Sequence, residues 1–214
     1  MDAETDYAGY TRKMLKLAQV GVDLEVDVRF VDMLTPRQAR ILDIGCGIGS
    51  AVAGLRARGH QAFGIDPIPE LFQAATALHE PHWFRQMDAG SLDKSDLIAT
   101  GLPATFDALM ATGNVPEFLT PLEIEQVFTF ARERLSTIGS LVIGTTTHGK
   151  HGPNFLDQTA RRSGMQLQQR FADWHLNPFV DGTPWSVSVY TLVGAREPFP
   201  APDGKFILPE HNKD

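Results

Sequence analysis

Cysteine is nearly absent from this sequence, because Cys46 is the single cysteine among 214 residues. An internal disulfide bond needs two cysteines and a multi-cysteine zinc site needs more, so both are excluded. No metal site is expected on other residues. The length fits one domain with a sizeable hydrophobic core.

Long apolar runs are also missing. No stretch approaches the ~20 apolar residues that a membrane-spanning helix requires. The first residues, Met1 to Asp6, are acidic and lack the basic start and apolar core of a secretory signal. These two absences predict a cytoplasmic protein that does not associate with a membrane.

A concentrated positive charge is the third absence. The formal net charge is −7, and basic residues occur in short, scattered clusters such as Arg161-Arg162. Proteins that bind nucleic acid usually present a basic face, because neutralising phosphates dominates their affinity. The composition therefore disfavours a nucleic-acid partner.

What the sequence does contain is an alternation of strand and helix patterns. Two helical patterns, within residues 1–22 and 24–34, come first, and the second stops before Pro36. Strands are then predicted over 40–44, 61–65, 83–86, 106–111, 138–145, 165–171 and 186–193, and helices over 49–58, 68–79, 120–135 and 154–163. Such alternation predicts an α/β fold, with a mostly parallel sheet and helices on both faces.

The last two predicted strands differ from the others. The segment between Phe171 and Ser186 has no helix-length connection and contains Asn177-Pro178 and Asp181-Gly182. Parallel neighbours need a crossover connection, so these two strands are expected to pair antiparallel.

The strongest functional pattern lies at residues 41–50, Ile-Leu-Asp-Ile-Gly-Cys-Gly-Ile-Gly-Ser. An apolar strand ends in three alternate glycines, and a helix-compatible stretch follows at once. Glycines at such a turn let a ligand approach the backbone closely. Asp43, just before the glycines, would repel a pyrophosphate and attract a ligand that carries an ammonium group.

This segment resembles motif I of the class I S-adenosylmethionine-dependent methyltransferases, an acid followed by GxGxG. The resemblance implies S-adenosyl-L-methionine as cofactor, bound in part by Asp43, Gly45, Cys46, Gly47 and Gly49. It also implies a Rossmann-like, seven-stranded, mostly parallel sheet whose last strand is antiparallel. In this interpretation residues 1–35 form a helical segment that covers the cofactor, 36–196 the methyltransferase domain and 197–214 a Pro-rich tail.

The end of the second predicted strand carries another acid, Asp66, 17 residues beyond Gly49. Ligands of open α/β sheets bind at the carboxyl ends of the strands, where a carboxylate can accept both hydroxyls of a ribose. Pro67 and Ile68 follow directly, and Ile68 is placed against an adenine face. The alternative for Asp66 is an ordinary helix cap.

The ends of the third and fourth strands complete the predicted cofactor site. The resemblance assigns Asp88 and Ala89 to the adenine, although a turn residue is an alternative for Asp88. Thr112-Gly113-Asn114 breaks the fourth strand where the reactive end of the cofactor is expected. Tyr10, in the N-terminal helical pattern, is a further candidate for the methionine moiety.

The acceptor is expected to be a small molecule. The Thr112-Gly113-Asn114 break resembles methyltransferases of the small-molecule type and lacks the Asn/Asp-Pro-Pro-aromatic motif of members that methylate nucleic-acid amino groups. His148, just past the fifth strand, is the candidate general base. The oligomeric state, monomer or homodimer, is left open.

Two alternatives stand beside this interpretation. One is a catalytically silent protein that keeps the same fold and binds S-adenosylmethionine. A nicotinamide-dependent oxidoreductase fits less well, since its GxGxxG motif would place the third glycine at Ser50.

Overall fold

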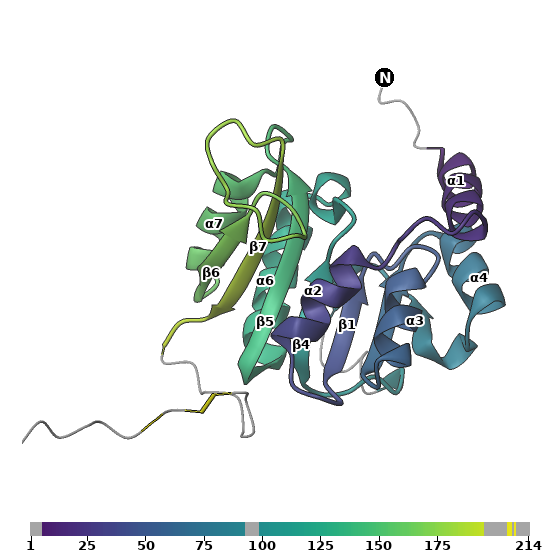
Figure 1. Cartoon of the computed structure of the whole chain (residues 1–214), viewed down its shortest axis with the longest axis horizontal. Coiled ribbons are helices and arrows are strands. Elements are labelled where there is room, and N and C mark those ends of the chain that lie inside the picture. Colours follow the sequence, from purple (N-terminus) through teal and green to yellow (C-terminus); the bar gives the residue numbers. More distant parts are fainter. Residues whose placement is uncertain (1–5, 93–98, 195–204, 207, 209–214) are drawn as a thin grey trace, which may run out of the picture.

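The computed structural model describes residues 6–92, 99–194, 205–206 and 208, without the side chains of residues 7, 10 and 18 (Figure 1). Nearly all of the predicted tail, residues 197–214, lies outside these ranges. The strands are β1 (Arg40–Ile44), β2 (Gln61–Asp66), β3 (Phe84–Gln86), β4 (Phe106–Ala111), β5 (Leu135–Thr146), β6 (Met165–Phe171) and β7 (Trp185–Leu192). The helices are α1 (Tyr7–Gln19), α2 (Val26–Leu34), α3 (Ser50–Ala57), α4 (Pro69–Leu78), α6 (Pro121–Arg134) and α7 (Pro153–Arg162), with 3-10 turns η1 (Pro81–Trp83), η2 (Ala89–Ser91) and η3 (Val115–Phe118).

The strands form one seven-stranded sheet in the order β3-β2-β1-β4-β5-β7-β6. The neighbours from β3 to β5 are parallel, while β7 is antiparallel to both β5 and β6. The predicted Rossmann-like fold with a reversed last strand is therefore confirmed. The order reverses at β1 and β4, and in open α/β sheets this is the place where ligands bind.

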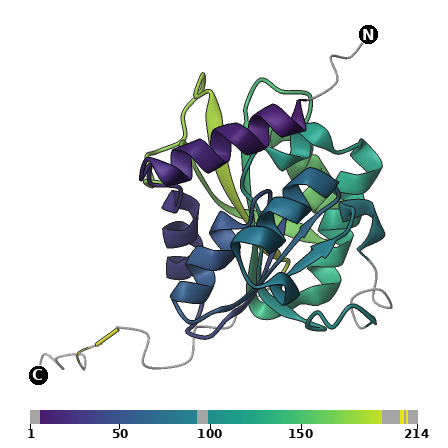
Figure 2. The same cartoon turned by 90° about the vertical axis from the view of Figure 1, so that its right-hand side faces the viewer.

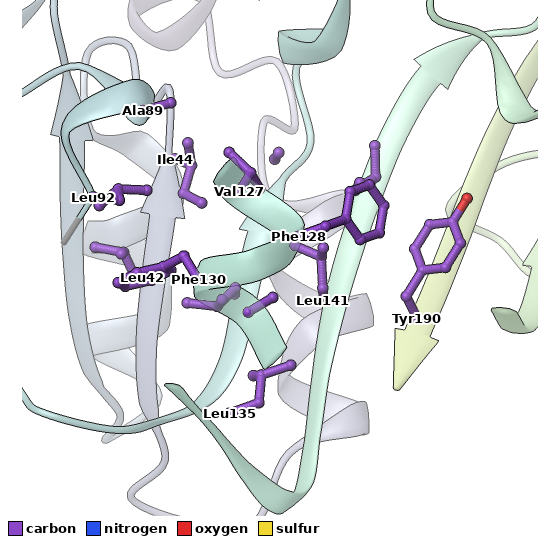
Figure 3. Close-up of a cluster of buried hydrophobic side chains, with 14 of the residues drawn as sticks. Leu42, Ile44, Ala89, Leu92, Val127, Phe128, Phe130, Leu135, Leu141 and Tyr190 are labelled. Atoms are coloured by element: carbon purple, nitrogen blue, oxygen red, sulfur yellow. The ribbon is translucent and has the colours of Figure 1, made fainter. Parts of the chain in front are cut away.

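Helices cover both faces of the sheet (Figure 1). On one face, Val28 and Val31 of α2 and Val52 of α3 pack against Ile41 of β1. On the other face, α6 and α7 cover a second apolar cluster, in which the Phe128 ring meets the Tyr190 ring edge-on at 5.1 Å between centroids (Figure 3). These two clusters pack against both faces of the sheet and hold its strands in place. The loops that follow the carboxyl ends of the strands are therefore held in position as well.

The helix α1 lies apart from these two layers. It packs against α4 and lies across the end of the molecule toward which the parallel strands point (Figure 2). Every helix in the described ranges is too short or too polar to span a membrane.

The strand β5 is longer than the sequence predicts. It begins at Leu135 rather than at residue 138, because Leu135 pairs with Phe106 before the register shifts and Ser140 pairs with Ala108. The intervening Ser-Thr-Ile-Gly segment has the composition of a turn but lies in the sheet as an irregularity.

Candidate functional site

Side chains alternate along a strand, and this alternation decides which polar groups meet at the carboxyl edge. In β1, Ile41 faces α2 and α3 whereas Leu42 faces the opposite cluster, so Asp43 points toward α2 and α3. The same count places Asp66 of β2 and Thr112 after β4 on that face. Three neighbouring strands therefore each place one polar side chain at the carboxyl edge, on the face that α2 and α3 cover.

The glycine turn that follows β1 is tied to β2 by backbone hydrogen bonds. The N–H groups of Gly45 and Cys46 donate to the carbonyl of Ile65 at 2.8 and 3.0 Å. The N–H of Gly47 donates to Oδ2 of Asp66 at 2.9 Å. The structure thus brings together motif I and the acid at the end of β2, as the sequence predicted.

Two of the glycines are required by both conformation and packing. Gly45 and Gly49 have φ values of +73° and +82°, a region that side-chain-bearing residues rarely adopt. A Cβ at Gly45 would lie 2.7 Å from the side chain of Val115, and one at Gly49 would lie 2.6 Å from the Phe84 ring. The turn therefore has little freedom to accept larger residues.

The carboxylate of Asp66 accepts hydrogen bonds from the backbone of the turn and still has free acceptor positions for a ligand. Its Oδ1 accepts from the Ile68 N–H at 3.0 Å, and its side chain is nearly buried. Burial raises the pKa of Asp66, and its backbone hydrogen bonds from Ile68 and Gly47 act in the opposite direction. Each oxygen uses one of its two acceptor positions, so the carboxylate can still accept hydroxyls. Pro67 is exposed beside it, and Ile68 is half-buried.

Asp43 is the most unusual group at this edge. It is 4% exposed, and in the described ranges no donor forms a hydrogen bond with its carboxylate. Burial raises its pKa well above the ordinary range, and the negative charges of Asp27 and Asp66 raise it further. A buried carboxylate without a partner is costly, so this site fits a ligand that brings a positive charge. S-adenosylmethionine carries such charges on its sulfonium and ammonium groups.

Asp27 of α2 belongs to this group and was not predicted from the sequence. Its Oδ2 accepts from the Thr112 hydroxyl at 2.7 Å, and burial raises the pKa of its carboxyl group. The signal for it was present, since Asp27 precedes Val31 by four residues and Leu34 by seven. It therefore lies on the apolar stripe of a helix that packs against the sheet, where a charge is rare unless it has a partner or a function.

The predicted adenine segment lies beside β2. The Met87 N–H donates to the carbonyl of Asp66 at 3.2 Å, which places Asp88 and Ala89 next to the carboxyl end of that strand. Asp88 caps η2 by accepting from the Gly90 N–H at 2.6 Å. The Ala89 side chain is buried in the core, so its backbone and the second Asp88 oxygen are the groups open to a ligand.

After β4 the backbone makes a fixed bend. Asn114 has a φ of +64°, and its Oδ1 accepts from the Thr145 hydroxyl and the Thr146 N–H, both at 2.9 Å. These bonds join the end of β4 to the end of β5 and leave the neighbouring Gly113 exposed. Asn114 thus positions the segment, and its amide nitrogen is the part that remains for a ligand.

His148 lies further along the same edge. It is exposed on the loop after β5, where it lines a hollow of about 380 Å³ with Lys150, Arg170 and Asp181. No hydrogen bond or ring contact joins it to the glycine turn within the described ranges. Its role as a general base therefore stays a prediction.

Two further points concern the remaining predictions. Tyr10 lies in α1, but its side chain is outside the described part of the structure, so its contact with the cofactor stays a prediction. Among the described residues, no group of three or more histidine, cysteine or acidic side chains is arranged to hold a metal ion.

Comparisons with known proteins agree with this geometry. Residues 41–139 match the model of a family described as a methyltransferase domain. A TehB-like SAM-dependent methyltransferase from Corynebacterium glutamicum is similar with a TM-score of 0.76 and 29% identity, over 87% of this chain and 97% of that one. A search of curated protein sequences finds no match.

Two more distant structures share the fold. The CcbJ methyltransferase from Streptomyces caelestis has a TM-score of 0.67 and 17% identity, over 78% of this chain and 94% of that one. An S-adenosylmethionine-dependent methyltransferase from Clostridium acetobutylicum has a TM-score of 0.68 and 11% identity, over 89% of this chain and the whole of that one.

Proposed function

Because the chain carries a class I S-adenosylmethionine-dependent methyltransferase domain, with S-adenosylmethionine as its cofactor, we propose that it transfers a methyl group to a small molecule. The acceptor atom is a nitrogen, oxygen, sulfur or carbon nucleophile. When bound, the cofactor supplies a methyl group that its sulfonium makes electrophilic, and the nucleophile displaces it in line.

The residues of the chain contribute by binding and orienting the cofactor. Asp66 accepts the ribose hydroxyls, Asp88 the adenine amino group, and Asp43 stabilises the positive charge of the methionine end. Holding the reactants in a near-attack geometry is the main contribution a protein makes to such a displacement. For acceptors that must lose a proton, His148 is the proposed base, because it is exposed on the loop that follows the carboxyl end of β5.

The observation that carries the proposal is the carboxylate of Asp43, which is buried and has no hydrogen-bond donor among the described residues. A dinucleotide would place a pyrophosphate at the glycine turn, and two negative groups would then share a site of low dielectric. A cationic nucleoside instead relieves the charge of Asp43. This difference favours the methyl donor over a nicotinamide cofactor.

A small-molecule acceptor is supported by the charge of the chain. The net charge is −7, and in the clusters at 132–134 and 161–162 Arg132 pairs with Glu133 at 3.2 Å and Arg162 with Glu125 at 3.0 Å. Such a surface offers little to attract a phosphate backbone.

Calorimetric titration with S-adenosylhomocysteine, the demethylated product, tests the cofactor site. The wild type is expected to bind it, and Asp66→Ala is expected to weaken binding at least 10-fold. Asp23→Ala is the matched control, because Asp23 is an exposed acid that pairs with Arg29. No binding at hundreds of micromolar, or equal binding by Asp66→Ala, would contradict the proposed cofactor site.

A turnover assay separates an enzyme from a silent binding protein. The protein is incubated with S-adenosylmethionine and pooled metabolites, and S-adenosylhomocysteine formation is measured. We expect acceptor-dependent formation that Asp66→Ala abolishes. Normal cofactor binding without turnover on any pool would support the silent alternative instead.

A further inference from the structure

We propose that Asp27 of α2 binds the methionyl ammonium group of S-adenosylmethionine, together with Asp43. This rests on the proposed function and names a residue that forms part of its cofactor site. The argument depends on how Asp27 is held, on the charges around it, and on its place along the edge of the sheet.

Two hydrogen bonds fix the carboxylate of Asp27. Its Oδ2 accepts from the Thr112 hydroxyl at 2.7 Å, and its Oδ1 accepts from the Val28 N–H at 2.8 Å. Each oxygen keeps a second acceptor position. The residue is half-buried, and its partner Thr112 follows β4 at the carboxyl edge of the sheet. A carboxylate held in this way is prepared to accept further donors without losing side-chain freedom.

The charges around Asp27 are unbalanced. Asp43 is 4% exposed and without a hydrogen-bond donor in the described ranges, and the negative charges of Asp27 and Asp66 act on it. Arg29 is the cation whose charge acts on Asp27, but it is exposed and forms a bidentate pair with Asp23 at 3.1 and 2.7 Å. A positive group from outside the described chain would therefore stabilise the charged forms of Asp27 and Asp43.

The chemistry of the site selects an ammonium group. The acidic residues here do not form a group that holds a metal ion in the described part of the chain. A sulfonium has no N–H to donate, whereas an ammonium has three donors for the free acceptor positions of carboxylates.

The order of the strands selects the methionine end of the cofactor. Asp66 ends β2 and Asp88 follows β3; both are proposed to hold the nucleoside, and these strands lie on one side of β1. Asp43 is the last residue but one of β1, and Thr112, which holds Asp27, follows β4 on its other side. A cofactor whose nucleoside lies at β2 and β3 therefore extends its amino-acid chain across β1 toward β4 and Asp27.

Two ligands and a matched pair of variants test this inference. S-adenosylhomocysteine contains the ammonium group, whereas 5′-methylthioadenosine lacks the whole amino-acid chain. By calorimetry, Asp27→Asn is expected to weaken S-adenosylhomocysteine at least 10-fold and to change methylthioadenosine less than 2-fold. Asp66→Ala should weaken both ligands, and Asp23→Asn, an exposed acid close to the same helix, should weaken neither.

A ligand-side measurement on the wild type makes the test independent of variant folding. The analogue of S-adenosylhomocysteine with hydrogen in place of the amino group should bind at least 10-fold more weakly to the wild type. The same replacement should matter much less in Asp27→Asn, because coupled groups are not additive.

The outcomes separate this inference from the proposed function. Equal weakening of both ligands by Asp27→Asn, or no weakening of either, overturns the role of Asp27 while the cofactor site stands. An amino group whose removal does not change affinity for the wild type overturns it as well. If the wild type binds neither nucleoside, the proposed function itself fails.

Discussion

At the scale of single residues, the proposed function gives Asp43 two opposing effects: it attracts the cationic ligand, and its buried charge is unfavourable to the ligand-free protein. It is buried without a hydrogen-bond donor in the described ranges, and its nearest charges are negative. Groups that serve binding at the expense of stability are common at functional sites. Both effects can be measured, because removing the charge of Asp43 should raise the stability of the ligand-free protein and lower its affinity for the ligand.

Asp43→Asn is expected to stabilise the ligand-free protein. The folded-state pKa of Asp43 is raised, so the stability it contributes is present below its unfolded pKa and is lost as pH rises through the folded pKa. At neutral pH the substitution should therefore add about 1 kcal/mol, or roughly 2–4 °C in Tm. Thermal melting measures this. Asp23→Asn is the control, because Asp23 is an exposed carboxylate whose charge Arg29 already balances, and the hydrogen bond from Arg29 lowers its pKa to about 2. A lower Tm for Asp43→Asn would contradict the assignment.

The affinity for S-adenosylhomocysteine is expected to fall as pH decreases from 8 to 5. The groups that face Asp43 are the carboxyls of Asp27 and Asp66, whose pKa values are also raised by burial, and the Cys46 thiol, which its raised pKa keeps neutral. Protonated carboxyls attract a cation weakly, so the loss approaches about 10-fold per pH unit once one group is protonated. Titrations across this range measure the slope, and Asp43→Asn should flatten it. An affinity independent of pH would show that these carboxyls do not meet a cation.

At the scale of elements, the glycine turn links conformation to packing. Gly47 and Gly49 both have positive φ, but a Cβ at Gly47 would meet no atom within 4 Å, whereas one at Gly49 would meet the Phe84 ring. The conformational penalty alone is about 1–2 kcal/mol. A substitution at Gly47 therefore measures the backbone conformational cost alone, whereas one at Gly49 measures that cost together with the steric clash with Phe84.

We expect Gly47→Ala to cost about 1 kcal/mol and Gly49→Ala about 3 kcal/mol of unfolding free energy. The second value adds overpacking, typically 1–3 kcal/mol, to the conformational cost. Urea denaturation measures both. Equal losses would mean that Phe84 moves aside at little cost.

Local signals in the sequence were enough to place most elements. The bounds of β1, β4 and β6 agree with the prediction, and α6, which a capping box between Thr120 and Glu123 starts, begins within one residue of the predicted start at 120. These features depend on residues close together in the chain. The early start of β5 depends on pairing with Phe106, which is distant in sequence, and no local pattern encodes it.

The same distinction applies to the candidate site. Asp43 and Asp66 could be identified because both end strands that converge at one edge. Asp27 could not be identified in this way, because its place in the site depends on its hydrogen bond with Thr112, which lies 85 residues later in the chain. A single polar residue in a short helix is easily taken for a solvent-exposed one. Its apolar neighbours on the stripe were the only local clue.

At the scale of the whole molecule, α2 is part of the core. Val28, Phe30 and Val31 are at most 2% exposed and belong to the cluster that covers one face of the sheet. The boundary at residue 35 stays a prediction about domain organisation, but it can be tested by truncation.

Removal of residues 1–20 should leave a cooperative unfolding transition, whereas removal of 1–35 should abolish it. The longer truncation removes three buried apolar side chains, each worth about 1.5–3 kcal/mol, against a total stability of roughly 5–15 kcal/mol. Denaturation followed by circular dichroism measures both. A folded protein lacking 1–35 would establish the domain without α2.

The carboxylates of Asp27 and Asp43, whose pKa values burial raises, also affect how much of the protein persists in a cell. A ligand that binds only the folded state at 100 times its Kd adds about 2.7 kcal/mol to stability. Because Asp27 and Asp43 weaken the empty protein, a fall in the supply of methyl donor would expose more of the population to unfolding and proteolysis. The abundance of this protein should therefore follow the donor concentration, without any dedicated regulator.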